Sequence, residues 1–127
     1  MKRELGVIMS QTDAFGTITF VNDAFCEISK YAREEVVGKP HNIVRHPDMP
    51  SLLFMKLWST IQAGGTFRAV IKNRAKDGSY YWVSATIMPY TSPSIDGTRY
   101  ISARHLIEDE EQAERLFEQQ MARLALL

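Results

Sequence analysis

The segment Pro40–Pro50 concentrates side chains that could do chemistry. Within eleven residues it places two histidines, an arginine, an asparagine and an aspartate among three prolines. Each proline fixes its own φ angle and restricts the residue before it, so the segment cannot form a long helix. Rigid polar loops on a scaffold often bind ligands, and the same composition also suits a turn whose polar groups only cap the backbone. The sequence around the loop decides between these two interpretations.

Periodicity predicts the elements that position this loop. Alternating β-branched and aromatic residues predict strands on both sides of it, and helical spacing of apolar residues predicts helices next to it. The Asp77-Gly78 pair is a strong hairpin signal between two of the strands. Ser51 is the predicted N-cap of the helix that follows the loop. The predicted strands are 7–12, 17–21, 66–72, 80–90 and 99–107, and the predicted helices are 22–30, 33–37, 51–63 and one from 108 onward.

This order of elements predicts an α+β fold. Two strands, a helical crossover and a three-strand meander form a five-stranded antiparallel sheet with short helices on one face. A sheet covered on one side encloses a pocket, which is the usual binding site of a small domain. We expect residues 1–107 to form this domain and residues 108–127 to form a C-terminal helix.

Composition excludes several classes of protein. A length of 127 residues, 45% of them hydrophobic and 24% charged, indicates one globular domain. The formal net charge is zero, and the excess of acidic residues in 108–127 is balanced by a weak, scattered positive charge elsewhere. That charge is too small to predict nucleic-acid binding. The sequence has no apolar run long enough for a membrane helix and no signal-peptide core.

Motifs for catalysis and metal binding are also missing. The sequence has no phosphate-binding loop and no recognisable triad, so we expect no enzymatic activity. The spacing of His41, His46, Asp48 and His105 matches no zinc signature. The single cysteine, Cys26, excludes an intrachain disulfide and fits a small core residue in a reducing compartment.

Two patterns resemble those of PAS domains. The first, at residues 18–40, runs from a strand into an asparagine that opens a helix and ends at a Gly-Lys-Pro turn. The second, at residues 73–82, reads Asn-x-x-x-Asp-Gly-x-x-x-Trp. The loop at 40–50 is more specific, and it closely resembles the loop of PAS domains from bacterial aerotaxis receptors. The resemblance covers residues 8–107.

This resemblance implies a flavin site. PAS domains of aerotaxis receptors hold FAD, and the matching loop is required there for binding it. An arginine can engage a pyrophosphate through paired hydrogen bonds, and asparagine amides suit the polar edge of an isoalloxazine. The cofactor-binding residues that the resemblance implies are Arg45, His46, Asp48, Asn22, Trp58 and Asn73.

Departures from the family pattern leave other cofactors open. Phe67 and Ala69 stand where flavin-binding relatives typically carry tryptophan and glycine, and an inward methyl at Ala69 would narrow the pocket. Cys26 is not in the position that forms a photoadduct in light-sensing relatives. Haem, with His41 or His46 as axial ligand, is the alternative cofactor, and a PAS domain without a cofactor, acting as an interaction module, is the third possibility.

Several of these residues also have a purely structural interpretation. The loop residues could tie the loop down by an internal salt bridge, and Asn22 could serve only as a helix cap. We expect His41 to cap the backbone or face solvent, Trp82 to lie in the core or on the sheet face, and His105 to be exposed.

The resemblance implies an intracellular, cytoplasmic redox or oxygen-related sensor that binds FAD without turnover. Its output domain would lie elsewhere in a longer chain. The C-terminal helix is the predicted signalling element, pairing with its copy in a homodimer. A stripe at roughly heptad spacing supports this, and folding of the helix onto its own sheet is the alternative. The stripe consists of Ala113, Phe117, Gln120, Leu124 and Leu127, widened by Leu116 and Met121.

Overall fold

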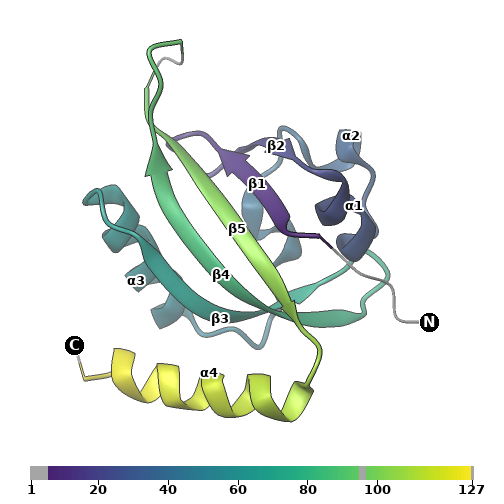
Figure 1. Ribbon diagram of the computed structural model, residues 1–127, viewed down its shortest axis with the longest axis vertical. Helices are drawn as coiled ribbons and strands as arrows, with labels where there is room; N and C mark the ends of the chain where they lie inside the picture. The colour runs from purple at the N-terminus through teal and green to yellow at the C-terminus, as the bar shows by residue number, and fades with distance from the viewer. Residues whose placement is uncertain (1–5, 95–96, 127) are drawn as a thin grey trace.

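The computed structural model describes residues 6–94 and 97–126 and contains one five-stranded antiparallel sheet (Figure 1). The strand order is β2-β1-β5-β4-β3. The strands are β1 (Ile8–Thr12), β2 (Ile18–Val21), β3 (Phe67–Arg74), β4 (Tyr80–Tyr90) and β5 (Arg99–Ile107). The helices are α1 (Asp23–Ser29), α2 (Arg33–Val36), the 3₁₀ helix η1 (His41–Val44), α3 (Ser51–Gln62) and α4 (Glu110–Leu124). The predicted α+β fold is confirmed.

The two hairpin regions form where the turn residues predict them. Asp13 accepts hydrogen bonds at its carboxylate from the N–H groups of Phe15 and Thr17, which closes the β1–β2 turn. Asp77 accepts in the same way from Ser79 in the β3–β4 turn. Side chains on alternate positions of β3, β4 and β5 then point to opposite faces of the sheet.

The helices α1, α2, η1 and α3 cover one face of the sheet (Figure 1). Asn22 is the N-cap of α1, and its side chain accepts from the Phe25 N–H. The prediction that Ser51 caps α3 is wrong, because Pro50 already has extended φ and ψ angles at the N-cap and Ser51 is the first helical residue. The core between sheet and helices is apolar, with Phe25, Leu53 and Ile71 at most 1% exposed.

The C-terminal helix α4 lies across the β3 edge of the sheet (Figure 1). Ala113 and Gln120 of the predicted stripe are buried, and Phe117, Met121 and Leu124 pack against the core, whereas Leu116 is 40% exposed. Leu127 lies outside the described residues. In this arrangement the stripe contacts the helix's own domain.

A side chain of α4 also pairs with the edge strand. The Gln120 Oε1 accepts from the Val70 N–H at 2.6 Å, and its Nε2 donates to the Val70 carbonyl at 3.0 Å. These bonds satisfy backbone groups that an edge strand otherwise leaves unpaired. At the opposite edge, the Ile18 N–H donates to the Lys39 carbonyl, so the segment after α2 covers β2.

Candidate functional site

A pocket of about 320 Å³ lies between the inner face of the sheet and the segment containing η1 and α3. This volume is at the small end of the ~300–1,000 Å³ range of ligand pockets. Apolar and aromatic side chains form much of its wall, among them Val44, Phe54, Leu57, Trp58, Ile61 and Tyr100. The Trp58 and Tyr100 rings meet edge to face, with their centroids 5.7 Å apart. The pocket therefore has apolar, aromatic walls, which suit an aromatic ligand.

Arg104 brings a buried positive charge to the sheet side of the pocket. Its Nη1 donates to Asn73 Oδ1 at 2.8 Å, and its Nε donates to Ser102 Oγ at 2.9 Å. Only 7% of the residue is exposed, and no carboxylate pairs with it within the described parts of the chain. Burial lowers the pKa of Arg104, but a guanidinium stays protonated in proteins. The pocket therefore contains an uncompensated cation with unused N–H donors.

Asn73 lies beside Arg104 with its amide oriented by that contact. Since an arginine only donates, the Asn73 atom at 2.8 Å must be the carbonyl oxygen. The residue is 3% exposed and lines the pocket. No acceptor for its Nδ2 group is found among residues 6–94 and 97–126, so both amide N–H donors are free for a ligand.

His41 adds a neutral polar group to the same pocket. Its Nε2 lies 2.9 Å from Ser10 Oγ, and its ring meets Phe25 edge to face. Burial, with a smaller contribution from the charge of Arg104, lowers the pKa of His41 to about 3. The imidazole is therefore uncharged at neutral pH. The expectation that His41 only caps the backbone or faces solvent is wrong, because its partner Ser10 comes from a distant strand.

Arg45 supplies a second cation from the helix side. Its guanidinium carbon lies 4.0 Å from the centroid of the Phe54 ring, and Nη2 donates to the Met49 carbonyl at a long 3.5 Å. The residue lines the pocket and, in the part of the chain described, forms no ion pair with a carboxylate. A guanidinium with one weak hydrogen bond is available to an anionic group.

His46 and Asp48, the other predicted loop residues, do not line the pocket. His46 Nδ1 accepts from the Asp48 N–H at 3.0 Å, and its ring meets the edge of Tyr80. Asp48 Oδ2 lies 3.6 Å from the Lys72 ammonium, which sits 4.1 Å from the centroid of the Tyr80 ring. Burial and the nearby Lys72 charge lower the pKa of His46. Arg45 therefore lines the pocket, whereas His46 and Asp48 lie against Tyr80 and Lys72 of the β3–β4 hairpin.

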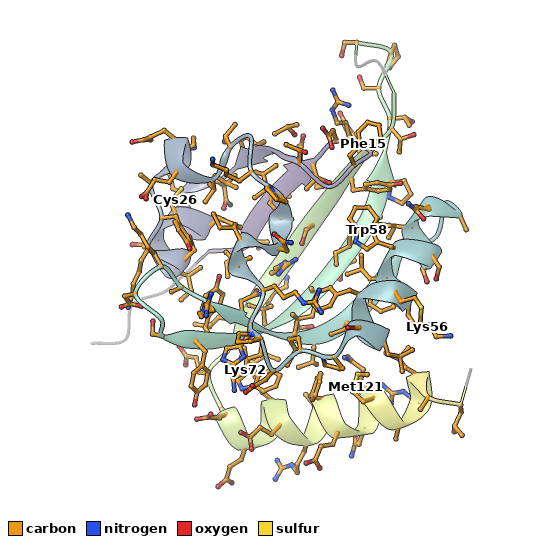
Figure 2. All side chains as sticks on the ribbon, turned by 180° about the vertical axis from the view of Figure 1, so that it is seen from behind. Phe15, Cys26, Lys56, Trp58, Lys72 and Met121 are labelled. Carbon is orange, nitrogen blue, oxygen red and sulfur yellow. The ribbon has the colours of Figure 1, made fainter. Side chains whose placement is uncertain are left out.

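The remaining predicted residues divide in the same way. Trp58 lines the pocket, whereas Asn22 does not. Besides capping α1, Asn22 accepts from the Met9 N–H at 3.0 Å and donates to the Val7 carbonyl at 2.7 Å, so its amide joins α1 to β1. Ala69 is buried on the inner face but is not part of the pocket wall. Cys26, on α1, also lies away from it (Figure 2).

Sequence reasoning missed Arg104, Ser102 and Ser10. The alternation of strand 99–107 held a usable signal, because Tyr100, Ser102 and Arg104 occupy every second position of one strand and therefore share a face. An arginine at an inward position of a half-buried strand is unusual and marks a site.

Metal clusters and membrane-spanning helices are absent from the described residues. No group of three or more histidine, cysteine, aspartate or glutamate residues could hold a metal ion there. In the same part of the chain, no helix has both the length and the hydrophobicity required to cross a membrane. His105, predicted to be exposed, is exposed, and Trp82 is buried beneath α4, with its ring 5.5 Å from that of Phe117.

A one-sided antiparallel sheet with a polar, partly cationic pocket beneath short helices defines a small α+β domain with a candidate ligand pocket. The chain belongs to the PAS family, because the family model described as the PAS fold matches residues 3–105. The resemblance drawn from the motifs is thereby confirmed.

Individual relatives agree with this assignment. The chain is 43% identical over 105 residues, 82% of its length, to the aerotaxis receptor of Escherichia coli (strain K12). It is 26% identical over 80% of its length to a nitrogen fixation regulatory protein of Klebsiella pneumoniae. It spans about a fifth of the length of each of these relatives.

Solved structures share the fold at low sequence identity. A light-oxygen-voltage domain studied with a flavin analogue matches with a TM-score of 0.79 at 18% identity, over 92% of this chain and 88% of that one. The light-state structure of the blue-light photoreceptor Aureochrome1 LOV matches with a TM-score of 0.78 at 17% identity, over 89% and 90% of the two chains.

Proposed function

We propose that this PAS domain binds FAD non-covalently in the pocket and acts as a redox or oxygen-related sensor without turnover. The observation that carries the proposal is the buried Arg104 guanidinium, which has no carboxylate partner among the described residues. Taking such a charge out of water costs several kcal/mol, even after relaxation of the surroundings. An electron-rich ligand in the pocket would offset this desolvation cost by accepting hydrogen bonds from the guanidinium.

The donor set fits an isoalloxazine. Such a ring system has flat apolar faces and one edge of carbonyl oxygens and ring nitrogens. Trp58 and the aliphatic wall provide surfaces for the faces, and the free donors of Asn73 and Arg104 suit the acceptors of the polar edge. When bound, a flavin supplies reversible electron transfer. The positive charge of Arg104 favours ligand states with more negative charge, so it would favour reduced states.

The relatives support the same choice of ligand. The first relative described above is named an aerotaxis receptor, and one solved structure with this fold was studied with a flavin analogue. On this basis we propose aerotaxis-type signalling, in a cytoplasmic domain, to an output domain within a longer chain. His46 and Asp48 would act in flavin binding from outside the pocket, by holding the loop that carries Arg45.

Haem is the second candidate, because His41 lies in the pocket and could ligate iron. The ring nitrogen Nε2 that would do so is already within hydrogen-bonding distance of Ser10 Oγ. An iron ligand would have to break that contact. The free amide and guanidinium donors favour a ligand with hydrogen-bonding ring atoms instead.

Homodimer formation through α4 would require the helix to leave its own domain. Its apolar stripe packs on the sheet, so the same surface cannot pair with a second copy at the same time. We propose that pairing competes with this packing and is open to regulation by the state of the pocket.

The ligand is tested by the spectrum of the purified chain and by Arg45→Ala. Flavin gives a yellow protein that releases FAD on denaturation, haem gives a red protein with a Soret band, and a colourless protein that takes up neither rejects both cofactors. Because charge-assisted hydrogen bonds contribute about 1.5–3 kcal/mol, Arg45→Ala should weaken FAD binding about ten- to a hundredfold.

The matched control is Arg68→Ala, which removes an exposed arginine of β3 that does not line the pocket. Both variants should unfold cooperatively. Full flavin occupancy in Arg45→Ala, equal to that of the control, would show that Arg45 is not an anchor.

A further inference from the structure

Phe15 combines two properties that rarely occur together. It lines the pocket, and yet 91% of the residue is exposed to solvent. A side chain with both properties must stand at the mouth of the pocket, with most of its ring outside. Covering a solvent-exposed aromatic ring with a ligand is favourable, because it removes apolar surface from water.

The turn that carries Phe15 is held rigidly. The Asp13 carboxylate accepts from the Phe15 N–H at 2.9 Å and from the Thr17 N–H at 3.0 Å. The Asp13 backbone N–H also donates to the Thr17 carbonyl at 2.9 Å. Phe15 is therefore presented to solvent by an ordered turn rather than by a loose loop.

The same turn is fitted against the pocket wall. A Cβ atom on Gly16 would lie 2.9 Å from Cζ2 of Trp58, so the backbone passes directly against the indole. The Gly16 carbonyl accepts from the His41 N–H at 3.0 Å, which joins the turn to the start of η1. Figure 2 shows Phe15 and Trp58 at the same end of the molecule. The position of Phe15 relative to the pocket is thus fixed by contacts on both sides of the mouth.

Residues of the 40–45 segment and of α3 line the pocket together with Phe15. They are Pro40, Asn42 and Arg45 from the segment and Phe54, Leu57, Trp58 and Ile61 from α3. A cavity of about 320 Å³ has room for one ring system of a dinucleotide but not for two ring systems, two sugar chains and a pyrophosphate. With the isoalloxazine inside, the adenine must lie outside, where Phe15 offers an open ring face.

We propose that Phe15 is an adenine-stacking residue that makes the pocket select the flavin dinucleotide over the mononucleotide. This inference rests on the proposed function, since it assumes that the ring in the pocket is a flavin. Bases of any sequence stack on aromatic rings because each has a π face. The contact would leave binding of the isoalloxazine itself unchanged.

The experiment compares affinities for FAD, FMN and riboflavin, measured by flavin fluorescence on the 127-residue chain after release of bound flavin. We expect Phe15→Ala to weaken FAD binding about tenfold, which is within the range of base stacking on one aromatic ring. Its affinities for FMN and riboflavin should stay within about twofold of wild type, and Phe15→Trp should retain FAD affinity. Because the side chain is exposed, neither substitution should lower thermal stability.

The matched control is Phe20→Ala, which removes another exposed phenylalanine, 45% accessible, that does not line the pocket. Its FAD affinity should equal that of wild type. Unchanged FAD affinity in Phe15→Ala, or equal losses for all three flavins, would overturn adenine stacking while leaving the flavin pocket in place. Failure of wild type to bind any of the three would instead overturn the proposed function, and the stacking role with it.

Discussion

Replacing Gln120 by leucine should loosen α4 from the sheet. Gln120 is 7% exposed and makes two hydrogen bonds to the backbone of Val70, one as acceptor and one as donor. Leucine has a similar volume and higher hydrophobicity, so the change removes the polar contacts without opening a large cavity. Any loss of stability then reports on the two hydrogen bonds.

The two bonds set the magnitude. Each buried hydrogen bond contributes about 1 kcal/mol net. Losing both should therefore weaken the docking of α4 by about 2 kcal/mol. That corresponds to an opening of the helix about thirtyfold more frequent. Gln120→Glu should show an intermediate effect at neutral pH, because a carboxylate can accept from the Val70 N–H but cannot donate to its carbonyl.

Hydrogen exchange at the Val70 amide is the direct assay, since its N–H donates to Gln120. It should exchange about thirtyfold faster in Gln120→Leu, while the neighbouring Ile71 amide, which the strand alternation turns toward β4, changes little. The control is Gln119→Leu, at an exposed position on the same helix.

Equal Val70 exchange in Gln120→Leu and wild type would refute the reasoning, because the bonds would then contribute nothing to docking. Light scattering over a concentration series adds a second result. A freed stripe that pairs with its copy should raise the mass of Gln120→Leu toward that of a dimer. A monomer that has released α4 would show that the stripe is not a dimer seam.

Three further predictions concern the pocket. Asn73→Leu should lose flavin or shift its reduction potential, whereas an unchanged spectrum and potential would leave Asn73 a structural role. The pKa of an unfolded histidine is about 6.5, and the pKa of His41 in the folded domain is about 3. The unfolded state therefore binds the proton more readily, and the domain loses stability as pH falls from 6.5 toward 3. The loss should reach about 2 kcal/mol by pH 5. Urea unfolding of His41→Gln should lack this pH dependence, and an equal slope in both proteins would contradict it. Gly16→Ala should lower the thermal stability of the domain more than Gly38→Ala. Both glycines have φ +89°, but only the methyl group at position 16 would lie 2.9 Å from Trp58. Equal losses of stability would mean that the indole moves aside.

The fold was predictable because its signals are local and repeat along the chain. Alternation in 80–90 and 99–107, the Asp-Gly turn and the cap at Asn22 each depend on residues close in sequence. The strand predicted at 66–72 ends two residues later, at Arg74, because its pairing with β4 continues to Tyr80. The Ser51 cap was misplaced because serine and proline both favour the start of a helix, and only backbone angles separate their positions.

The site was less predictable because its contacts join distant segments. His41 depends on Ser10, 31 residues away, and Arg104 depends on Asn73, also 31 residues away. Local sequence gives no information about such partners. The loop motif singled out Arg45, which lines the pocket, and also His46, which does not line it. The ring of His46 meets Tyr80 on the β3–β4 hairpin, a partner that the loop sequence does not reveal.

The edge strand β3 connects the pocket to α4, and under the proposed function this would give the domain a physical route for output. Asn73 faces the pocket from β3, and Val70, three residues earlier on the same strand, holds Gln120. The interface between α4 and the sheet contains one unpaired hydrogen-bond donor. The buried Trp82 Nε1–H beneath α4 has no acceptor within the described residues. An unpaired buried donor costs about 1–3 kcal/mol, which release of the helix into water would recover. Docking of α4 is therefore favoured by its apolar contacts with the core and by two bonds to Val70, and it is opposed by one unsatisfied donor. A displacement of β3 by a change at Asn73 would act on the two bonds to Val70. A domain built for stability alone would gain from pairing that indole, whereas a sensor needs a helix that a few kcal/mol can move.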